Sequence, residues 1–333
     1  MKTIVIAEAG VNHNGDLELA KNLIKVAAES GADYVKFQMF EAEKLATPSA
    51  VKAEYQIKNT NSPDSQFQML KSLEISKTDY VKLIKFSSEC NIEIFSTGFD
   101  IEMNNMLAEL GQRIFKVPSG EITNLPYLRN IGQFGMDVIL STGMSNLDEI
   151  AAAINAINSA GTPLDSITVL HCTTAYPAPM EDINLLAMNT IAQKFGVKVG
   201  YSDHSEGIEV SIAAVALGAV VIEKHFTSDR NLPGPDHKAS LEPNELRNMI
   251  KAIRNIESAR GDGVKKLTGS EISNLSVARK SIVAGVDIPK GGIFTEENLT
   301  TKRAIGGISP MNWDEVIGKI ARKDYLQNDS IEL

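Results

Sequence analysis

Short apolar runs recur through the first 225 residues, and each ends in a cluster of polar residues. The eight runs and the residues that follow them are TIVIA before Glu8, DYV before Lys36, IEIF before Ser96, IF before Lys116, VIL before Ser141, ITVL before His171, VGY before Ser202 and VVIE before Lys224. Apolar runs separated by stretches with a helical pattern are typical of buried parallel strands. Eight of them predict an α/β fold, a closed (β/α)8 (TIM) barrel with its chemistry at the carboxyl ends of the strands.

The segments between these runs carry helical patterns. Apolar residues recur at helical spacing in residues 17–30, and the pattern stops at Gly31. By the same criteria, we predict helices over residues 17–30, 78–90, 146–160, 205–217 and 243–259. Residues 39–73 are longer and polar, without a clear strand pattern. We expect them to form an extended loop over the site, where specificity elements often lie.

The pattern changes after residues 261–266. Helical repeats give way to short strand-like runs with Pro and Gly turns. We therefore predict a TIM-barrel domain over 1–265, a linker over 266–280 and a small domain over 281–333. A module of about 50 residues has a thin core, so we expect it to lean on the barrel or on a second subunit.

Charge and hydropathy narrow the class of protein. The chain has 333 residues, with 33 Lys and Arg against 42 Asp and Glu, which gives a net charge of −9. This balance argues against nucleic-acid binding, which requires a basic surface. An anionic small molecule is still compatible, because a few lysines in a cleft outweigh the average field. No apolar stretch approaches a membrane span, so we expect no membrane partner and a cytoplasmic location.

The two cysteines, Cys90 and Cys172, form no disulfide or zinc pattern. Cys172 follows a predicted strand next to His171. It is therefore either a nucleophilic thiol or a buried structural cysteine, and the second interpretation is favoured.

Two histidines end neighbouring predicted strands. His204 and His225 follow the seventh and eighth runs, and adjacent strands lie about 5 Å apart. Two imidazoles in that arrangement can share one divalent ion and leave positions open for water or substrate. With no thiolate nearby, such a site suits manganese, magnesium or zinc. The alternative is that one of them is a hydrogen-bonded core histidine.

Two lysines and two carboxylates also follow strand runs. Lys36 and Gln38 are two apart and so face the same side of their strand. A buried ammonium requires an anion, so Lys36 and Lys116 predict a ligand with phosphate and carboxylate groups; otherwise they are solvated strand-end lysines. Glu8 and Glu121 are candidates for base or orienting roles. Their alternative is to pair structurally with the lysines.

Taken together, these elements resemble the sialic acid synthase family. The matching elements are EAGVNHNG (8–15), KFQ (36–38), KVPSGE (116–121), STGM (141–144), HCTTAYPAP (171–179), YSDH (201–204), EKHF (223–226) and GPD (234–236). In the tail, NLTTKRAIGGIS (298–309) resembles the family's antifreeze-like (SAF, β-clip) domain. The resemblance covers nearly the whole chain in one order and is far more specific than any single motif.

The resemblance implies a reaction and a set of roles. Phosphoenolpyruvate would condense with an N-acylated mannosamine-type sugar and water, giving a nine-carbon 2-keto-3-deoxy acid and phosphate. His204 and His225 would hold Mn²⁺, or Mg²⁺ or Co²⁺, which polarises the sugar aldehyde. The other implied roles are phosphoenolpyruvate binding by Lys36, Thr97, Lys116, Ser119, Ser141 and Ser202, proton transfer by Glu121, orientation of water or sugar hydroxyls by Glu8 and Asp236, and lining of the pocket by Gln38 and Tyr176.

Arg303 matches an arginine that the tail domain delivers to the partner subunit's site, where it meets the sugar's N-acyl group. The resemblance therefore implies a domain-swapped homodimer. Two positions depart from the pattern. Thr174 stands where some members have asparagine in the phosphate-contacting loop, and Ala304 replaces a proline often found after the arginine.

The identity of the sugar depends on finer features. Residues 46–56 and 116–128 resemble bacterial legionaminic acid synthases more than N-acetylneuraminic acid synthases. This favours 2,4-diacetamido-2,4,6-trideoxymannose and a product of N,N'-diacetyllegionaminic acid, with N-acetylneuraminic acid as the other main candidate. Further alternatives are a pseudaminic acid synthase, a lysine Schiff-base aldolase or lyase on the same barrel, and a sugar- or ice-binding protein that acts through its tail.

Overall fold

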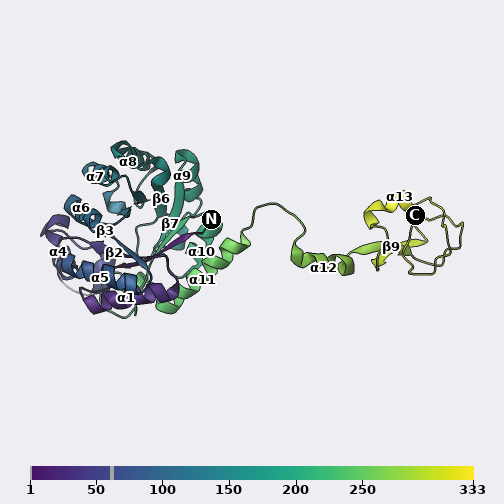
Figure 1. Cartoon of the computed structure of the whole chain (residues 1–333), viewed down its shortest axis with the longest axis horizontal. Helices are drawn as coiled ribbons and strands as arrows, with labels where there is room; N and C mark the ends of the chain where they lie inside the picture. The colour runs from purple at the N-terminus through teal and green to yellow at the C-terminus, as the bar shows by residue number, and fades with distance from the viewer. Residues whose placement is uncertain (1, 61–63) are drawn as a thin grey trace. The chain divides into compact units, whose positions relative to one another are not determined.

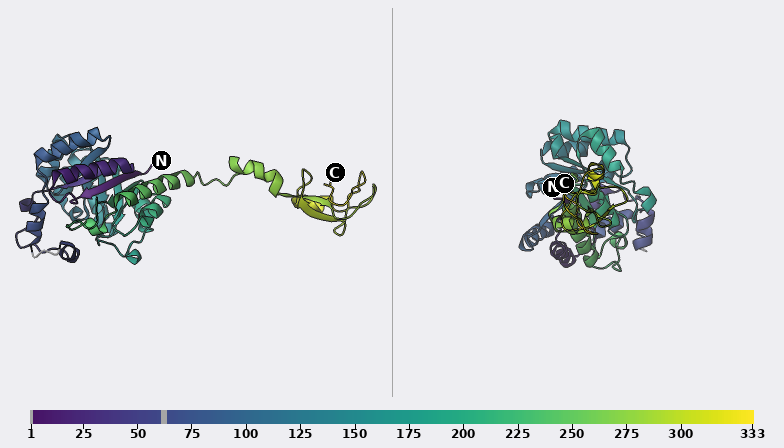
Figure 2. Two further views of the ribbon diagram at one scale, coloured as in Figure 1. Left: turned by 90° about the horizontal axis from the view of Figure 1, so that it is seen from below. Right: turned by 90° about the vertical axis from the view of Figure 1, so that its right-hand side faces the viewer.

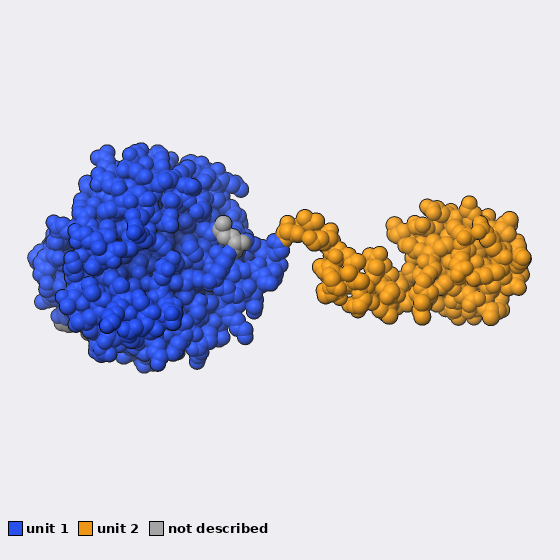
Figure 3. Space-filling view, viewed as in Figure 1, with its two compact units in different colours: residues 1–261 blue, residues 262–333 orange. Residues whose placement is uncertain are grey.

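The computed structural model describes residues 2–60 and 64–333. The chain divides into two compact units, residues 1–261 and 262–333 (Figure 3). In the first unit, helices surround a sheet of eight strands (Figures 1 and 2). None of the described helices is long and apolar enough to cross a membrane.

The eight strands are parallel and follow the eight apolar runs. They are β1 (Ile4–Gly10), β2 (Tyr34–Met39), β3 (Glu93–Gly98), β4 (Ile114–Val117), β5 (Asp137–Ser141), β6 (Ile167–Cys172), β7 (Lys198–Asp203) and β8 (Val221–His225). Their order is β3-β2-β1-β8-β7-β6-β5-β4, and β3 lies next to β4. The predicted barrel is thereby confirmed. In the β1–β8 pair, Glu8 is opposite His225.

Strand alternation separates two apolar layers. Val5, Ala7 and Val35 belong to the large core shared with the surrounding helices. The neighbouring positions face the barrel axis, where a smaller cluster is formed by Ile6, Phe95, Ile139, Leu170 and Val221. Because this cluster fills the axis, the barrel is a packed core and not a pore.

The helices of the first unit follow the strands along the chain, and α11 comes after the last strand. They are α1 (Leu17–Ser30), α2 (Ala42–Leu45), α3 (Glu54–Thr60), α4 (Gln66–Ser72), α5 (Lys77–Glu89), α6 (Ile101–Glu109), α7 (Leu125–Gln133), α8 (Leu147–Ala160), α9 (Ala187–Phe195), α10 (Glu209–Ala216) and α11 (Pro243–Ala259), with 3₁₀ turns η1 (Ser119–Glu121), η2 (Leu164–Ser166), η3 (Met180–Asp182) and η4 (His237–Ala239). The predicted helices at 17–30 and 243–259 match in both bounds, and those at 78–90 and 146–160 match within one residue.

Two expectations need correction. The helix predicted from residue 205 begins only at Glu209, because Ser205 folds back to hydrogen-bond the Asp203 carboxylate (N–H to Oδ1, 2.9 Å) and Gly207 adopts a φ of +75°. Within the expected loop at 39–73, we did not predict α2, α3 and α4. Part of that loop, residues 61–63, lies outside the described residues.

At the amino ends of the strands, Asp33 joins three segments of the barrel. Its carboxylate accepts hydrogen bonds from the Val5 amide (2.8 Å) and from Nη2 of Arg254 on α11 (2.7 Å), and it pairs with Lys2. Arg254 also donates to the Thr3 carbonyl (2.7 Å). This end of a TIM barrel serves stability more than chemistry.

The second unit has its own small core. Its elements are α12 (Gly269–Ala278), β9 (Lys280–Ala284), β10 (Leu299–Arg303), η5 (Pro310–Asn312) and α13 (Trp313–Val316). β9 and β10 are antiparallel and pack around Ile282, Phe294 and Tyr325. We predicted a linker where α12 lies. Thr268 and Glu271 form a capping box at the start of this helix. This pair of residues is recognisable in the sequence and could have predicted the helix.

Candidate active site

A cavity of about 400 Å³ opens at the carboxyl ends of the barrel strands. The predicted residues that line it are Glu8, Lys36, Gln38, Thr97, Lys116, Ser119, Ser141, Thr174, Tyr176, Ser202, His204, His225 and Asp236. They come from seven of the eight strands or from the loops that follow the strands. Side chains from the β2–α5 segment complete the wall, among them Tyr55 on α3 and Met69 on α4.

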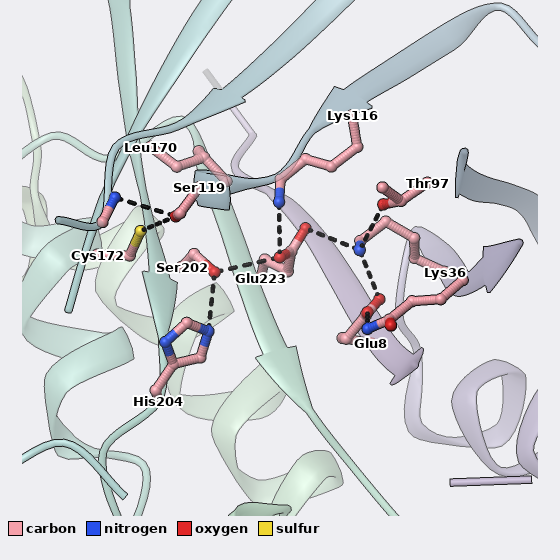
Figure 4. Close-up of polar contacts among 12 residues, drawn as sticks. Glu8, Lys36, Thr97, Lys116, Ser119, Leu170, Cys172, Ser202, His204 and Glu223 are labelled. Carbon is pink, nitrogen blue, oxygen red and sulfur yellow. Dashed lines mark hydrogen bonds and ion pairs between the residues drawn. The ribbon is translucent and has the colours of Figure 1, made fainter. Parts of the chain in front are cut away.

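A buried ion-pair network forms the floor of the cavity (Figure 4). Glu223 on β8 lies between the two lysines, with Oε1 3.2 Å from Lys116 Nζ and Oε2 3.7 Å from Lys36 Nζ. Lys36 also lies 2.9 Å from Glu8 Oε2 and donates to Thr97 Oγ1 at 3.1 Å. These four charged side chains are at most 5% exposed. The network therefore places two ammonium groups side by side in a site shielded from bulk water.

The two carboxylates of this network have opposite protonation tendencies. Burial disfavours the charge on Glu223, but Lys116 and Lys36 outweigh it and lower its pKa to about 2. Glu8 contacts only one ammonium, so burial prevails and raises its pKa to about 7. Burial also opposes the charge on Lys36, yet Glu223 and Glu8 together raise its pKa. Lys36 is thus a cation at neutral pH.

Hydroxyl groups line the wall next to Lys116. Ser119 Oγ accepts a hydrogen bond from the Gly143 amide (3.0 Å) and lies 3.3 Å from Cys172 Sγ. A Cβ on Gly143 would lie 2.0 Å from Thr174 Oγ1 and 2.8 Å from Ser119 Oγ, so a side chain at this position would displace these hydroxyls. Among the described residues, the buried Ser141 Oγ has no hydrogen-bond partner. Burying a hydroxyl without a hydrogen-bond partner costs free energy, so we infer that Ser141 donates to an oxygen of a ligand.

Cys172 is 4% exposed and contacts this hydroxyl wall. Its position agrees with a buried structural cysteine, the interpretation that we favoured from sequence.

The two histidines converge at the carboxyl ends of β7 and β8. Their ring centroids are 5.7 Å apart, and the Tyr176 ring lies 4.2 Å from that of His204. His204 Nδ1 is 2.7 Å from the Thr173 carbonyl and therefore donates to it. Ser202 Oγ, 3.5 Å from His204 Nε2, donates its proton to Glu223 Oε1 at 3.1 Å. The lone pair of His204 Nε2 is consequently left for a ligand.

Burial keeps both imidazoles neutral, as metal ligands must be. It lowers the pKa of His204 to about 4 and that of His225 well below its ordinary value. The buried Nδ1 of His225 has no hydrogen-bond partner among the residues that the structure describes. No group of three His, Cys, Asp or Glu side chains in the described part of the chain could hold a metal. The pair therefore fits an ion that completes its coordination with oxygen from water or substrate.

Asp236, in the loop after β8, has a different environment from the other carboxylates. Its side chain is buried, and burial alone raises its pKa to about 6. Tyr55 stacks on Tyr176 nearby, with ring centroids 5.0 Å apart, and the charge of Asp236 raises the pKa of both phenols further, beyond the effect of burial. This region of the cavity thus combines the aromatic rings of Tyr55 and Tyr176 with a carboxylate, Asp236, that has no ion-pair partner among the described residues.

Comparison with known proteins decides the family. Residues 23–265 match the NeuB family, and residues 279–331 match the SAF domain. The chain belongs to the NeuB family. It is 55% identical to an N,N'-diacetyllegionaminic acid synthase from Campylobacter jejuni over 99% of both chains, and 46% identical to one from Legionella pneumophila over 96% of this chain and 90% of the relative.

Solved structures agree with this assignment. An N-acetylneuraminic acid synthetase from Leptospira borgpetersenii, solved in complex with citrate, aligns with a TM-score of 0.72 at 35% identity. The alignment covers 83% of this chain and 90% of that structure. The resemblance to the sialic acid synthase family and the antifreeze-like tail are both confirmed.

One predicted residue of the first unit, Glu121, is not among the residues that line the cavity. Glu121 ends η1, and its carboxylate accepts a hydrogen bond from Asn124 (2.6 Å), the residue that caps α7. Arg303 ends β10 in the second unit and is exposed. Conversely, we did not predict Glu223, the carboxylate shared by the lysines. Its signal was its spacing, because a residue two before His225 faces the same side of β8.

Proposed function

We propose that this chain condenses phosphoenolpyruvate with an N-acylated mannosamine-type sugar and water, and releases a nine-carbon 2-keto-3-deoxy acid and phosphate. We further propose 2,4-diacetamido-2,4,6-trideoxymannose as the sugar and N,N'-diacetyllegionaminic acid as the product. The observation that carries the proposal is the pair of buried lysines in the barrel mouth of a chain that is 55% identical to an N,N'-diacetyllegionaminic acid synthase.

The floor of the cavity suits phosphoenolpyruvate. Its phosphate and carboxylate require two cations and several hydrogen-bond donors, and Lys36, Lys116 and the hydroxyls of Thr97, Ser119, Ser141 and Ser202 supply them. A ligand held there replaces water around the ammonium groups with fixed contacts. It also orients the methylene carbon of the enol toward the rest of the cavity, where the second substrate binds.

Among the two carboxylates predicted for proton transfer or orientation, Glu8 is better placed. It lies in the cavity between Lys36 and Gln38, whose Nε2 donates to Glu8 Oε1 at 3.2 Å. Glu121 instead accepts a hydrogen bond from the cap of α7. We therefore propose that Glu8 holds or transfers the proton that accompanies addition of water, and that Glu121 has a structural role.

We propose that His204 and His225 bind Mn²⁺, or a similar divalent ion such as Mg²⁺ or Co²⁺. Their neutral rings, the lone pair of His204 Nε2 and the unpaired Nδ1 of His225 support this assignment. When bound, the ion supplies Lewis acidity for the carbonyl oxygen of the sugar. The chain itself orients the rings, through the Thr173 carbonyl at His204 Nδ1 and through the stacked Tyr176.

The upper wall of the cavity favours a sugar with a deoxy carbon. Met69, Leu70 and Leu73 reach it from α4 and its end, and Val11 and Phe99 contribute apolar surface beside them. Apolar contacts stabilise a methyl group but give a hydroxyl no partner. N-acetylmannosamine and the precursor of pseudaminic acid remain the competing acceptors.

The test is a phosphate-release assay with phosphoenolpyruvate and each candidate sugar. We expect release only when both substrates are present, with kcat/KM for the 2,4-diacetamido sugar about tenfold or more above that for N-acetylmannosamine. The product should be identified by mass spectrometry. Release without any sugar, or no release with any of the acceptors, would refute the proposed reaction.

We also propose a homodimer in which the SAF domain of one subunit places Arg303 at the cavity of the other. Two observations support this arrangement. Arg303 is exposed on β10, and it matches the tail arginine of the sialic acid synthase family.

The two remaining alternatives receive no support from the site. A Schiff-base lysine requires a depressed pKa, whereas the carboxylates around Lys36 raise its pKa. A sugar- or ice-binding protein with an inert barrel has no use for four buried charges in one cavity.

A further inference from the structure

The turn formed by residues 233–236, between β8 and α11, carries Asp236 into the cavity. We refer to it as the 233–236 turn. Gly234 has a φ of +153°, and a Cβ at this position would lie 2.6 Å from His237 Cδ2 and 2.9 Å from Asn14 Oδ1. The turn is therefore enclosed by side chains that do not themselves line the cavity.

Side chains from two other segments hold the carbonyl groups of this turn. Asn14, in the loop after β1, donates from Nδ2 to the Pro233 carbonyl at 2.8 Å. Asn59, on α3, donates to the Pro235 carbonyl at 2.6 Å. Ser240 donates to the carbonyl of Asp236 at 2.7 Å. The backbone of the turn is thus fixed from three directions.

His237 connects the turn to Asn14. Because Asn14 Nδ2 donates to Pro233, its Oδ1 faces His237 Nε2 at 3.2 Å, and Nε2 must be the donor. Nδ1 of the same ring then accepts from Thr227 Oγ1 at 2.7 Å. The ring is fully buried. Both of its nitrogens are therefore satisfied by partners within the protein, and it has no free group to offer a substrate.

The Asp236 carboxylate has the opposite character. It lines the cavity, yet no hydrogen-bond or ion-pair partner for it is found among the residues that the structure describes. An anion such as phosphoenolpyruvate would be repelled by it, whereas the hydroxyl and amide groups of a neutral sugar are donors that it can accept. Since its side chain is not held by hydrogen bonds, its position depends on the backbone of the turn.

We propose that Asn14, Asn59 and His237 are positioning residues for the acceptor sugar: they fix the 233–236 turn so that its carboxylate meets donor groups of the sugar. This inference rests on the proposed function. A displacement of about 1 Å in such a contact is enough to weaken it by an order of magnitude or more.

The test compares Asn14→Gly and Asn59→Ala with the full-length wild-type protein. Asn14 has a φ of +51°, so glycine removes its side chain without backbone strain. For each variant, we expect the KM for the sugar to rise about tenfold, while the KM for phosphoenolpyruvate changes less than about twofold. Asn59→Asp keeps the size of the side chain but loses the donor, and we expect the same result.

Asn91→Gly is the matched control. Asn91 is exposed, has a φ of +55° and precedes β3 at the opposite end of the barrel. It should leave both KM values unchanged. Hydrogen exchange provides a readout that does not depend on activity: the amides of Gly234 and of residues 236–240 should exchange faster in Asn14→Gly than in Asn91→Gly.

The outcomes separate this inference from the proposed function. If the wild-type protein releases no phosphate with any sugar, the reaction is refuted, and hydrogen exchange alone decides whether these side chains fix the 233–236 turn. If the wild type is active but both variants keep its KM for the sugar, the positioning role is wrong. It is also wrong if the two KM values rise in parallel, because that would indicate general damage to the barrel.

Discussion

Glu223 and Lys116 form an ion pair of 3.2 Å in which both side chains are at most 5% exposed. The other oxygen of the same carboxylate faces Lys36 at 3.7 Å. Glu223 thus contacts both ammonium groups, and Glu8 supplies a second carboxylate to Lys36 at 2.9 Å.

We predict that Glu223→Gln lowers the free energy of unfolding of the ligand-free protein by about 3–5 kcal/mol, because among the described residues it leaves the buried Lys116 without a carboxylate partner. Phosphoenolpyruvate should restore more stability in the variant than in the wild type, since its anionic groups bind the same cations. Urea denaturation with and without the ligand measures both effects. Glu29→Gln, which removes an exposed pair with Lys25 at 3.8 Å, is the control and should have little effect. An unchanged urea midpoint for Glu223→Gln would show that the network is not stabilising.

Removal of divalent cations should abolish phosphate release. We expect EDTA to stop the reaction and Mn²⁺ to restore it, because we propose that an ion held by His204 and His225 polarises the sugar carbonyl. Titration calorimetry should find one Mn²⁺ site in the wild type, and none in His204→Ala. Full activity after exhaustive chelation would contradict the metal assignment.

Asp33 should contribute to stability in a pH-dependent way. Burial works against its charge, but hydrogen bonds from Lys2, the Val5 amide and Arg254 lower its pKa below the ordinary 3.8. A carboxylate with a lowered pKa stabilises the fold above that ordinary value and loses this effect as the pH falls through the folded pKa. Asp33→Asn should therefore cost about 2 kcal/mol at pH 7. The difference from the wild type should shrink from about pH 5 downward. Urea unfolding at several pH values measures it, and a constant difference down to pH 3 would be inconsistent with this account.

Arg303 can be tested by mixing subunits. Arg303→Ala alone should raise the KM for the sugar, and Lys116→Met alone should abolish activity. If the tail of one subunit completes the barrel of the other, mixed dimers contain one intact site. After subunit exchange, an equal mixture should regain about a quarter of wild-type activity. No recovery in a mixture whose mixed dimers are confirmed by native mass spectrometry would argue that Arg303 acts within its own chain.

The barrel could be predicted from sequence because its signals are local. β-Branched runs mark the strands, and caps such as Asp16 before α1 and Asn146 before α8 mark where helices begin. Most of the site followed from these strands, because polar residues at their carboxyl ends must meet at one end of a barrel. The short helices α2 to α4 escaped detection, since packing over the cavity and not a long periodic pattern determines them.

The parts of the site that were missed depend on contacts between distant segments. Glu121 is an exception, because its carboxylate accepts a hydrogen bond from Asn124, only three residues further along the chain. The hydrogen bond between Asn14 and His237 joins residues 223 positions apart, and no spacing rule predicts it. Glu223 differs, because strand alternation alone would have placed it beside His225.

The apolar cluster around Ile6 and Leu170 seals the barrel axis beneath the charged floor. In the described part of the chain, we therefore expect ligands to enter and leave the cavity at the carboxyl ends of the strands. We therefore expect ordered binding, in which phosphoenolpyruvate, proposed to lie deepest against the ammonium groups, binds before the sugar.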